Sequence, residues 1–267
     1  MRSMASRSPL TRKLCRAAEQ MSPAAKSPGS TTRRGPAKRK ATSRKAAVEE
    51  LRAADPIMAG LIDACGVISS PPRKRADPEE HYGALLHAVV NQQLSVKAGA
   101  AIYGRLTERF GGKTPSPEQL LADDPEELRL AAGLSRSKVG FMRSLAEHIL
   151  SGELELEHLD DLPDEEVMAE LVAVKGIGEW TAHMFLMSHL HRPDVLAPGD
   201  LGIRRAIERA YSLEAIPDRE TVERLAERWR PHRTLACRYL WRSLNNEPIA
   251  PPTGHPGKTS VRAPAKG

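Results

Sequence analysis

The sequence of 267 residues is long enough for one large domain or for two lobes that share a core. Hydrophobic residues make up 40% of the chain and aromatic residues 4%, and no apolar run approaches the roughly 18 residues that a membrane-spanning helix needs. Three cysteines (Cys15, Cys65 and Cys237) are too few and too scattered for a disulfide framework or a cysteine-ligated metal site. A reducing compartment fits this composition best.

The net charge of +6 is unevenly distributed along the chain. Residues 1–47 contain thirteen Lys or Arg and one acid, and residues 248–267 contain three Lys or Arg and no acid, which leaves −9 for residues 48–247. The charge of the body alone therefore does not indicate a nucleic-acid-binding protein. We predict that residues 1–47 are a disordered basic tail and that the Pro- and Gly-rich residues 248–267 are a second disordered tail. We favour a role for the basic tail in binding phosphates. The alternatives are that it acts as a targeting signal or that it only increases solubility.

Between the tails, the pattern of apolar residues predicts helices almost throughout residues 48–247, and no stretch alternates as strands do. Helix starts are marked by Asp77-Pro78, Ser116-Pro117, Asp124-Pro125 and Pro163-Asp164. We expect helices over 48–65, from 78 through 90, over 96–110, from 117, from 125, over 137–150, from 163 to about 174, after 178, after 200, and over 221–229 and 234–244. The predicted fold class is all-α.

The segment from Leu171 to Met187 predicts two helices joined by Gly176-Ile177-Gly178. Two glycines around one apolar residue allow a sharp turn, and the free amides at the start of the following helix suit a phosphate oxygen. The carbonyls of Val172, Val174 and Ile177 could hold a monovalent cation, Na⁺ or K⁺, that bridges to the phosphate. On spacing alone, an ordinary C-cap in a helical hairpin explains the glycines better.

Four motifs in order give the chain a more specific resemblance. Lys175-Gly176-Ile177-Gly178-Glu179-Trp180-Thr181-Ala182 resembles the helix-hairpin-helix of a DNA glycosylase superfamily, and Leu196-Ala197-Pro198-Gly199-Asp200 resembles the loop with its catalytic aspartate. Val90-Asn91-Gln92-Gln93-Leu94-Ser95 resembles the element that enters the DNA minor groove, and Trp229-Arg230-Pro231 with Tyr239-Leu240-Trp241 resembles the last helix, which closes the pocket. Over about residues 78–247, order and spacing are similar to the 3-methyladenine DNA glycosylase II (alkylated-base) branch. The resemblance implies a two-lobed helical bundle with the active-site cleft between the lobes, without the N-terminal β-rich domain of the bacterial prototype.

The resemblance implies that Asp200 is catalytic, although aspartate is also a favoured helix N-cap. A carboxylate at this position could stabilise the positive charge that develops on the sugar, or it could orient the water that attacks C1′. A base alkylated at N3 or N7 is already cationic, so it leaves without a strong general acid, and it should prefer an aromatic pocket. The resemblance places Trp180, Met184, Trp241 and Tyr239 at this pocket, and for Tyr239 we favour core packing. Bacterial relatives often have an aromatic residue where this chain has Met184, which leaves the width of the substrate range open.

The resemblance also implies the DNA contacts. We expect Gly176, Ile177, Gly178 and Thr181 of the hairpin to bind the backbone, helped by local arginines, Arg204 first and also Arg205 and Arg233. A side chain that fills the gap left by a flipped base should project from the turn after Asn91, and we favour Gln93, with Leu94 next. The alternative is that Gln92 and Gln93 form hydrogen bonds between helices.

Two absences sharpen the prediction. Trp180 stands where lyase-active members of the superfamily have a lysine, which indicates a monofunctional enzyme. The four-cysteine cluster of the endonuclease branch is missing, so we expect no iron–sulfur cluster. The spacing of His183, His189 and His191 does not match a helical metal site, and we expect these to be surface histidines.

The sequence therefore predicts a glycosylase that excises 3-methyladenine and 7-methylguanine from damaged double-stranded DNA and leaves an abasic site. We expect a monomer with no required cofactor and no membrane partner, in the cytoplasm (nucleoid) of a bacterium or the nucleus of a eukaryote. The alternatives are a non-enzymatic helix-hairpin-helix DNA-binding module and a glycosylase for ethenoadenine, hypoxanthine or uracil.

Overall fold

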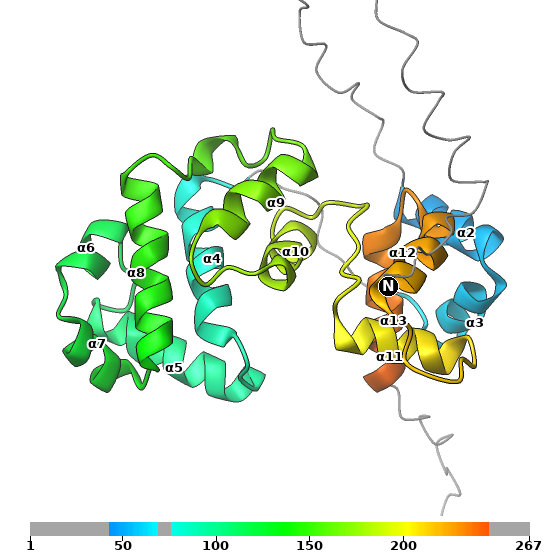
Figure 1. Ribbon diagram of the computed structural model, residues 1–267, viewed down its shortest axis with the longest axis horizontal. Coiled ribbons are helices and arrows are strands. Elements are labelled where there is room, and N and C mark those ends of the chain that lie inside the picture. Colours follow the sequence, from blue (N-terminus) through cyan, green and yellow to red (C-terminus); the bar gives the residue numbers. More distant parts are fainter. Residues whose placement is uncertain (1–42, 69–75, 246–267) are drawn as a thin grey trace, which may run out of the picture. The chain divides into compact units, whose positions relative to one another are not determined.

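The computed structural model describes residues 43–68 and 76–245, and the predicted tail over 248–267 and most of that over 1–47 lie outside these ranges. Every regular element within the described ranges is a helix, which confirms the predicted all-α class (Figure 1). None of these helices is both long and apolar enough to cross a bilayer. The helices are α2 (Arg44–Ala54), α3 (Pro56–Cys65), α4 (Pro78–Asn91), α5 (Val96–Arg109), α6 (Pro117–Ala122), α7 (Pro125–Ala132), α8 (Arg136–Leu150), η1 (Leu156–His158), α9 (Asp164–Ala173), α10 (Glu179–Ser188), α11 (Leu201–Ala210), α12 (Arg219–Ala226), η2 (Glu227–Trp229) and α13 (Arg233–Asn245).

The sequence signals for helix starts coincide with capped helices. Asp77 and Ser116 form capping boxes with Glu80 and Gln119, and in both helices a proline occupies the first turn. The Asp124 carboxylate likewise accepts hydrogen bonds from the first free amides of α7. These local bonds satisfy N–H groups that have no partner inside the helix, so short helices can begin at fixed residues.

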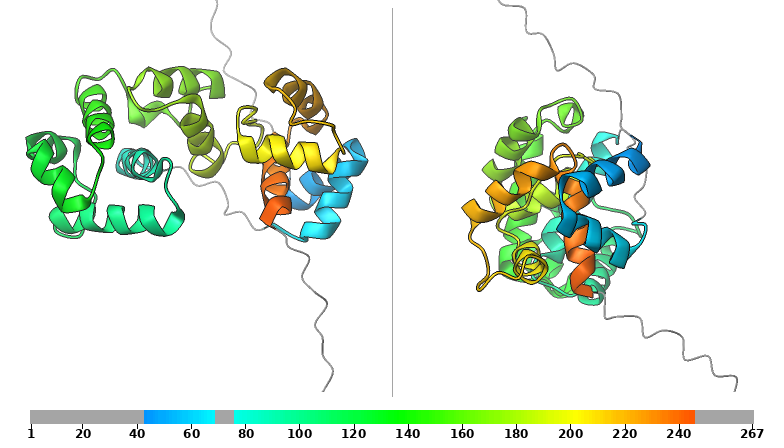
Figure 2. Two further views of the ribbon diagram at one scale, coloured as in Figure 1. Left: turned by 60° about the horizontal axis from the view of Figure 1, so that its bottom comes forward. Right: turned by 90° about the vertical axis from the view of Figure 1, so that its right-hand side faces the viewer.

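The helices contact one another in two sets. In the first, α4 packs against α5, α8 and α10, α6 and α7 pack against α8, and α9 packs against α10; Figure 1 shows α6 and α7 beside α8. In the second, α13 packs against α3 and α11, and α2 packs against α3. Figure 2 shows this second set as blue helices from one end of the described chain beside the orange helix α13 from the other end.

The single helix predicted over 48–65 is wrong, because the structure has two helices that meet at Asp55. Asp55 ends α2 and caps α3, accepting hydrogen bonds from the amides of Ile57 at 2.9 Å and Met58 at 3.3 Å. Proline at the next position disfavours a helical conformation in the residue before it, which explains the break.

The Asp55 carboxylate also joins α3 to distant elements. Its Oδ2 atom accepts hydrogen bonds from the Tyr211 hydroxyl and from Trp229 Nε1, the latter at 2.9 Å, and the residue has 0% of its surface exposed. Burial alone would raise the pKa of Asp55, but these hydrogen bonds outweigh burial and hold the pKa below its ordinary value.

The predicted start of the ordered body at residue 48 is also too late. Helix α2 begins at Arg44, and the Ser43 hydroxyl caps it by accepting from the Ala46 amide. Ala47 and Leu51 of this helix are buried in the core. The basic composition of residues 44–47 concealed this first turn, because a single buried alanine gives little hydrophobic signal.

Candidate active site

The Asp200 carboxylate lies at the start of α11 and accepts three hydrogen bonds. Its Oδ1 atom caps the helix by accepting from the Ile203 amide at 2.7 Å, and it also accepts from Trp241 Nε1 at 2.9 Å. Its Oδ2 atom accepts from Trp180 Nε1 at 2.7 Å. The structure thus brings three predicted site residues together from α10, α11 and α13.

Glycine at position 202 allows the Trp241 indole to come this close. A Cβ atom on Gly202 would lie 3.0 Å from Asp200 Oδ1 and 3.2 Å from Trp241 Cδ1. The role of Gly202 is not evident from the sequence, because a glycine inside a predicted helix does not reveal what packs against it.

The hairpin turn requires glycine at position 176 for two reasons. Its φ angle is +97°, a conformation that residues with a Cβ atom rarely adopt, and an added Cβ would lie 2.1 Å from Cγ of Phe141. Gly178 has a φ of −88°, and an added Cβ would have no atom within 4 Å. The folded protein therefore constrains the first glycine, while the space around the second is open to a partner.

Helix α10 begins at Glu179, and its N-cap residue Gly178 provides no side-chain hydrogen bond, unlike the N-cap residues Asp77, Ser116 and Asp200 of α4, α6 and α11. Its first-turn amides have no acceptor within the helix, and the helix dipole makes this end partially positive. The Ile177 amide is already used, donating to the Val174 carbonyl at 3.0 Å, and the Ile177 side chain is buried. The first amides of α10 are therefore the donors that an anion could meet.

The turn between α4 and α5 is tied to this hairpin. Gln92 Nε2 donates to the Gly176 carbonyl at 2.8 Å and to the Thr181 hydroxyl at 3.3 Å. Gln93 is exposed and has a φ of +56°, and Leu94 is 37% exposed. Gln92 therefore matches the interhelical alternative, whereas Gln93 and Leu94 face solvent. Thr181 is 4% exposed, and its hydroxyl accepts from Gln92. A DNA contact by Thr181 remains a prediction.

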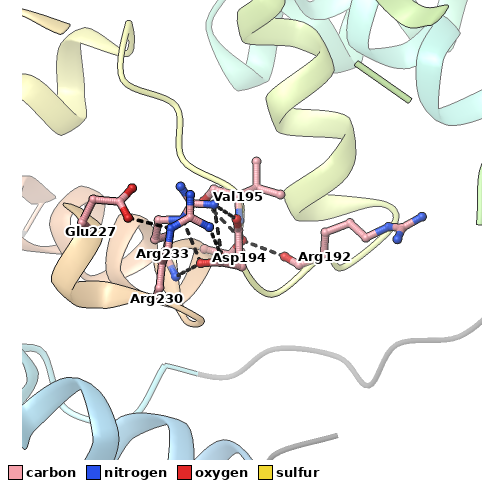
Figure 3. Close-up of polar contacts among 7 residues, drawn as sticks. Arg192, Asp194, Val195, Glu227, Arg230 and Arg233 are labelled. Atoms are coloured by element: carbon pink, nitrogen blue, oxygen red, sulfur yellow. Dashed lines mark hydrogen bonds and ion pairs between the residues drawn. The ribbon is translucent and has the colours of Figure 1, made fainter. Parts of the chain in front are cut away.

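The segment that leads from α10 to Asp200 is fixed to the start of α13 (Figure 3). The Thr234 hydroxyl donates to the Arg192 carbonyl at 2.7 Å and accepts from the Val195 amide at 3.0 Å. Asp194 accepts from Arg233 Nε at 2.8 Å and from Arg230 Nη1 at 2.9 Å. These contacts fix the chain that leads to Asp200, and no sequence motif indicates them.

Two of the arginines predicted to contact DNA have hydrogen-bond partners within the protein. The Arg233 guanidinium is held by Asp194, and Arg204 Nε donates to the Pro217 carbonyl at 2.7 Å. DNA contacts by these two residues remain predictions.

The other two predicted pocket residues lie in or against the core. Tyr239 is 1% exposed and belongs to the core, in agreement with the packing role favoured from the sequence, and Met184 is partly buried against the core. His183 and His189, expected at the surface, are partly buried, and this burial lowers the pKa of both. No cluster of His, Cys, Asp or Glu suited to a metal ion occurs among the described residues.

A groove of about 480 Å³ runs along the segment before Asp200, and its lining includes His183, Asp194, Pro198 and Arg219. Asp200, Trp180 and Trp241 do not line it. This groove is therefore not the predicted cleft with Asp200 at its mouth, which remains a prediction.

An all-α fold in which a Gly-Ile-Gly hairpin precedes a carboxylate at a helix start is the architecture of the helix-hairpin-helix base-excision proteins. The chain belongs to the HhH-GPD superfamily of base excision DNA repair proteins, whose family model matches residues 86–231. It is similar to DNA-3-methyladenine glycosylase 1 of Schizosaccharomyces pombe, with 36% identity over 64% of this chain and 76% of that protein.

Solved structures give the same result. The 3-methyladenine DNA glycosylase of Schizosaccharomyces pombe, in complex with abasic DNA, is similar with a TM-score of 0.67 and 33% identity, covering 75% of this chain and 97% of that one. A DNA-3-methyladenine glycosidase from Bacillus halodurans is similar with a TM-score of 0.64 and 36% identity, covering 74% and 88% of the two chains. At these identities the two structures are similar to this chain in sequence as well as in fold.

Proposed function

We propose that this protein is a DNA glycosylase that removes alkylated purines, chiefly 3-methyladenine and 7-methylguanine, from double-stranded DNA and leaves an abasic site. The observation that carries the proposal is the Asp200 carboxylate, held by two indole N–H groups beside the hairpin. The names of the relatives, which are 3-methyladenine glycosylases, support this substrate class.

The chemistry needs little more than a fixed negative charge. The bond between C1′ and the base nitrogen breaks, and the bonding electron pair leaves with the base, which neutralises the positive charge of an alkylated purine. The sugar becomes an oxocarbenium-like cation, which an anionic carboxylate stabilises. Water then adds its oxygen to C1′ and loses a proton to solvent. Asp200 supplies the charge for this step.

The predicted base pocket at Trp180 and Trp241 should favour cationic bases through its aromatic side chains. Trp180 is 50% exposed, so its ring is available to a base that has left the DNA stack. A cation over an indole face is stabilised by about 0.5–2 kcal/mol, whereas an undamaged neutral base gains less. This difference, together with the better leaving group, gives selectivity for the damaged base.

The hairpin would bind the DNA backbone through the first amides of α10 and the open space at Gly178. Gln93 and Leu94 would fill the gap left by the flipped nucleotide. The left-handed conformation of Gln93 supports this role, because non-glycine residues in such conformations often occur at functional sites.

We expect no required organic cofactor and no iron–sulfur cluster. A monovalent cation would be held by the carbonyls of Val172, Val174 and Ile177. Val172 lies in the last turn of α9, where the helix dipole favours a positive charge. Such an ion would strengthen phosphate binding at the hairpin.

We expect the enzyme to act as a monomer. It would have no lyase activity, because Trp180 occupies the position of the lysine that forms a Schiff base in lyase-active relatives. The product strand should then remain intact until alkali is added. Nicking without alkali would contradict this monofunctional mechanism.

The test is release of free base from methylated duplex DNA under single-turnover conditions. Wild type should release 3-methyladenine and 7-methylguanine, and Asp200→Asn should be slower by about 100-fold or more, as expected for loss of one electrostatic group. A wild-type protein that binds the DNA but releases no base would support the non-enzymatic alternative. Full activity of Asp200→Asn would refute the role given to Asp200.

A further inference from the structure

We propose that Trp180 and Trp241 are positioning residues, which act on the reaction by holding the Asp200 carboxylate with their indole N–H groups. This inference rests on the proposed function, and it assigns the two tryptophans a role beyond that of pocket walls.

Most of the hydrogen-bonding capacity of the Asp200 carboxylate is used within the protein. A carboxylate offers about four lone pairs, and Asp200 uses three of them, for Ile203 N, Trp241 Nε1 and Trp180 Nε1. The Ile203 amide alone would leave Oδ2 free to rotate toward solvent. The indole of Trp180 stops this rotation and leaves one lone pair, on Oδ2, for the substrate.

The two indole donors lie on different helices, so together they fix the position of the Asp200 carboxylate relative to both helices. Trp180 lies in the first turn of α10, directly after the hairpin, and Trp241 lies on α13. The two bonds therefore fix the carboxylate relative to both the hairpin and α13. Charged hydrogen bonds of this kind are stronger than neutral ones.

A third hydrogen bond between a tryptophan and an aspartate in the same chain can be compared with the two at Asp200. It contains three tryptophans, and the third, Trp229, donates its Nε1–H to Asp55. Each tryptophan thus pairs with an aspartate, but Asp55 is fully buried and remote from the hairpin in sequence. The Asp55 pair serves as a structural control for the Asp200 pairs.

Indole ¹⁵N–¹H spectra of the full-length protein test the contacts directly. Trp180→Phe and Trp241→Phe each remove one of three signals and so assign them. Asp200→Asn should shift the signals of Trp180 and Trp241 and leave that of Trp229 in place, and exchange of the Trp180 indole proton with solvent should accelerate about tenfold. The control Asp55→Asn should shift the Trp229 signal alone. Trp180 and Trp241 signals that do not respond to Asp200→Asn would overturn the inference.

Single-turnover excision rates distinguish a Trp180 that positions Asp200 through its N–H group from a Trp180 that only forms an aromatic wall of the base pocket. Phenylalanine keeps an aromatic ring but has no N–H donor, so Trp180→Phe should slow excision about tenfold if the donor matters. In the Asp200→Asn background, Trp180→Phe should have little further effect, because the carboxylate through which it acts is gone. An equal loss in both backgrounds, or no loss in wild type, would overturn the inference.

The outcomes also distinguish this inference from the proposed function. If wild type excises no base while the indole signals respond to Asp200→Asn, the proposed function fails and the carboxylate contacts remain. If excision depends on Asp200 but the indole signals do not, the positioning role fails and the proposed function stands.

Discussion

Replacing Asp55 by asparagine should lower the free energy of unfolding by about 3 kcal/mol. Asparagine can still cap α3 through its oxygen, but its amide nitrogen then faces Tyr211 and Trp229. The Tyr211 hydroxyl can rotate to accept, whereas the Trp229 N–H cannot and stays unsatisfied in the core. A buried unsatisfied donor costs about 1–3 kcal/mol, and hydrogen bonds to a charged group contribute about 1.5–3 kcal/mol each, partly offset by removal of a buried charge.

Urea unfolding at pH 7 measures this change directly, and thermal unfolding should show a midpoint lower by about 6–12 °C for a domain of this size. Asp63→Asn is the matched control, because Asp63 lies on the same helix but is exposed and pairs with Arg52. The control should change stability far less.

The same substitution makes a prediction about pH. The pKa of Asp55 is lowered in the folded protein, so its stabilising effect is fully present above the unfolded value of about 3.9 and is lost as the pH falls through the lower folded value. The difference between wild type and Asp55→Asn should therefore shrink below about pH 4. A difference that stays constant between pH 7 and pH 3, or a variant as stable as wild type, would refute this reasoning.

Four further substitutions, of which Gly178→Ala is a control, probe the hairpin and its supports. Gly176→Ala should destabilise the protein by about 3 kcal/mol in urea unfolding, because the φ angle and the Phe141 ring both exclude a Cβ atom, whereas Gly178→Ala should unfold like wild type; similar stabilities would contradict the geometry. Gln92→Leu should lower stability by about 1 kcal/mol and slow single-turnover excision, and an unchanged excision rate would show that the tie to the hairpin is not needed. Thr234→Val keeps the side-chain shape but leaves the Val195 amide without its acceptor, so a loss of about 1–3 kcal/mol is expected, and stability equal to wild type would exclude this anchor.

The sequence by itself determined the elements that depend on near neighbours in the chain. The helix starts at Asp77, Ser116 and Asp124 follow from side-chain caps within three residues, and their residue types are sufficient to predict them. The same signal was present at Asp55-Pro56, where the apolar pattern concealed it. The hairpin glycines and Asp200 were indicated by the resemblance of four motifs to a known family, because glycine spacing alone is explained better by an ordinary C-cap.

The direction of side-chain hydrogen bonds was decided only by the tertiary structure. The Asp200 carboxylate meets indoles that lie 20 and 41 residues away, and Thr181 turns inward to Gln92, 89 residues away. Sequence periodicity shows which face of a helix is apolar, but it does not show which donor reaches which acceptor. Those pairings depend on how separate helices pack. Here the packing of α10, α11 and α13 brings the indole N–H groups of Trp180 and Trp241 to the Asp200 carboxylate.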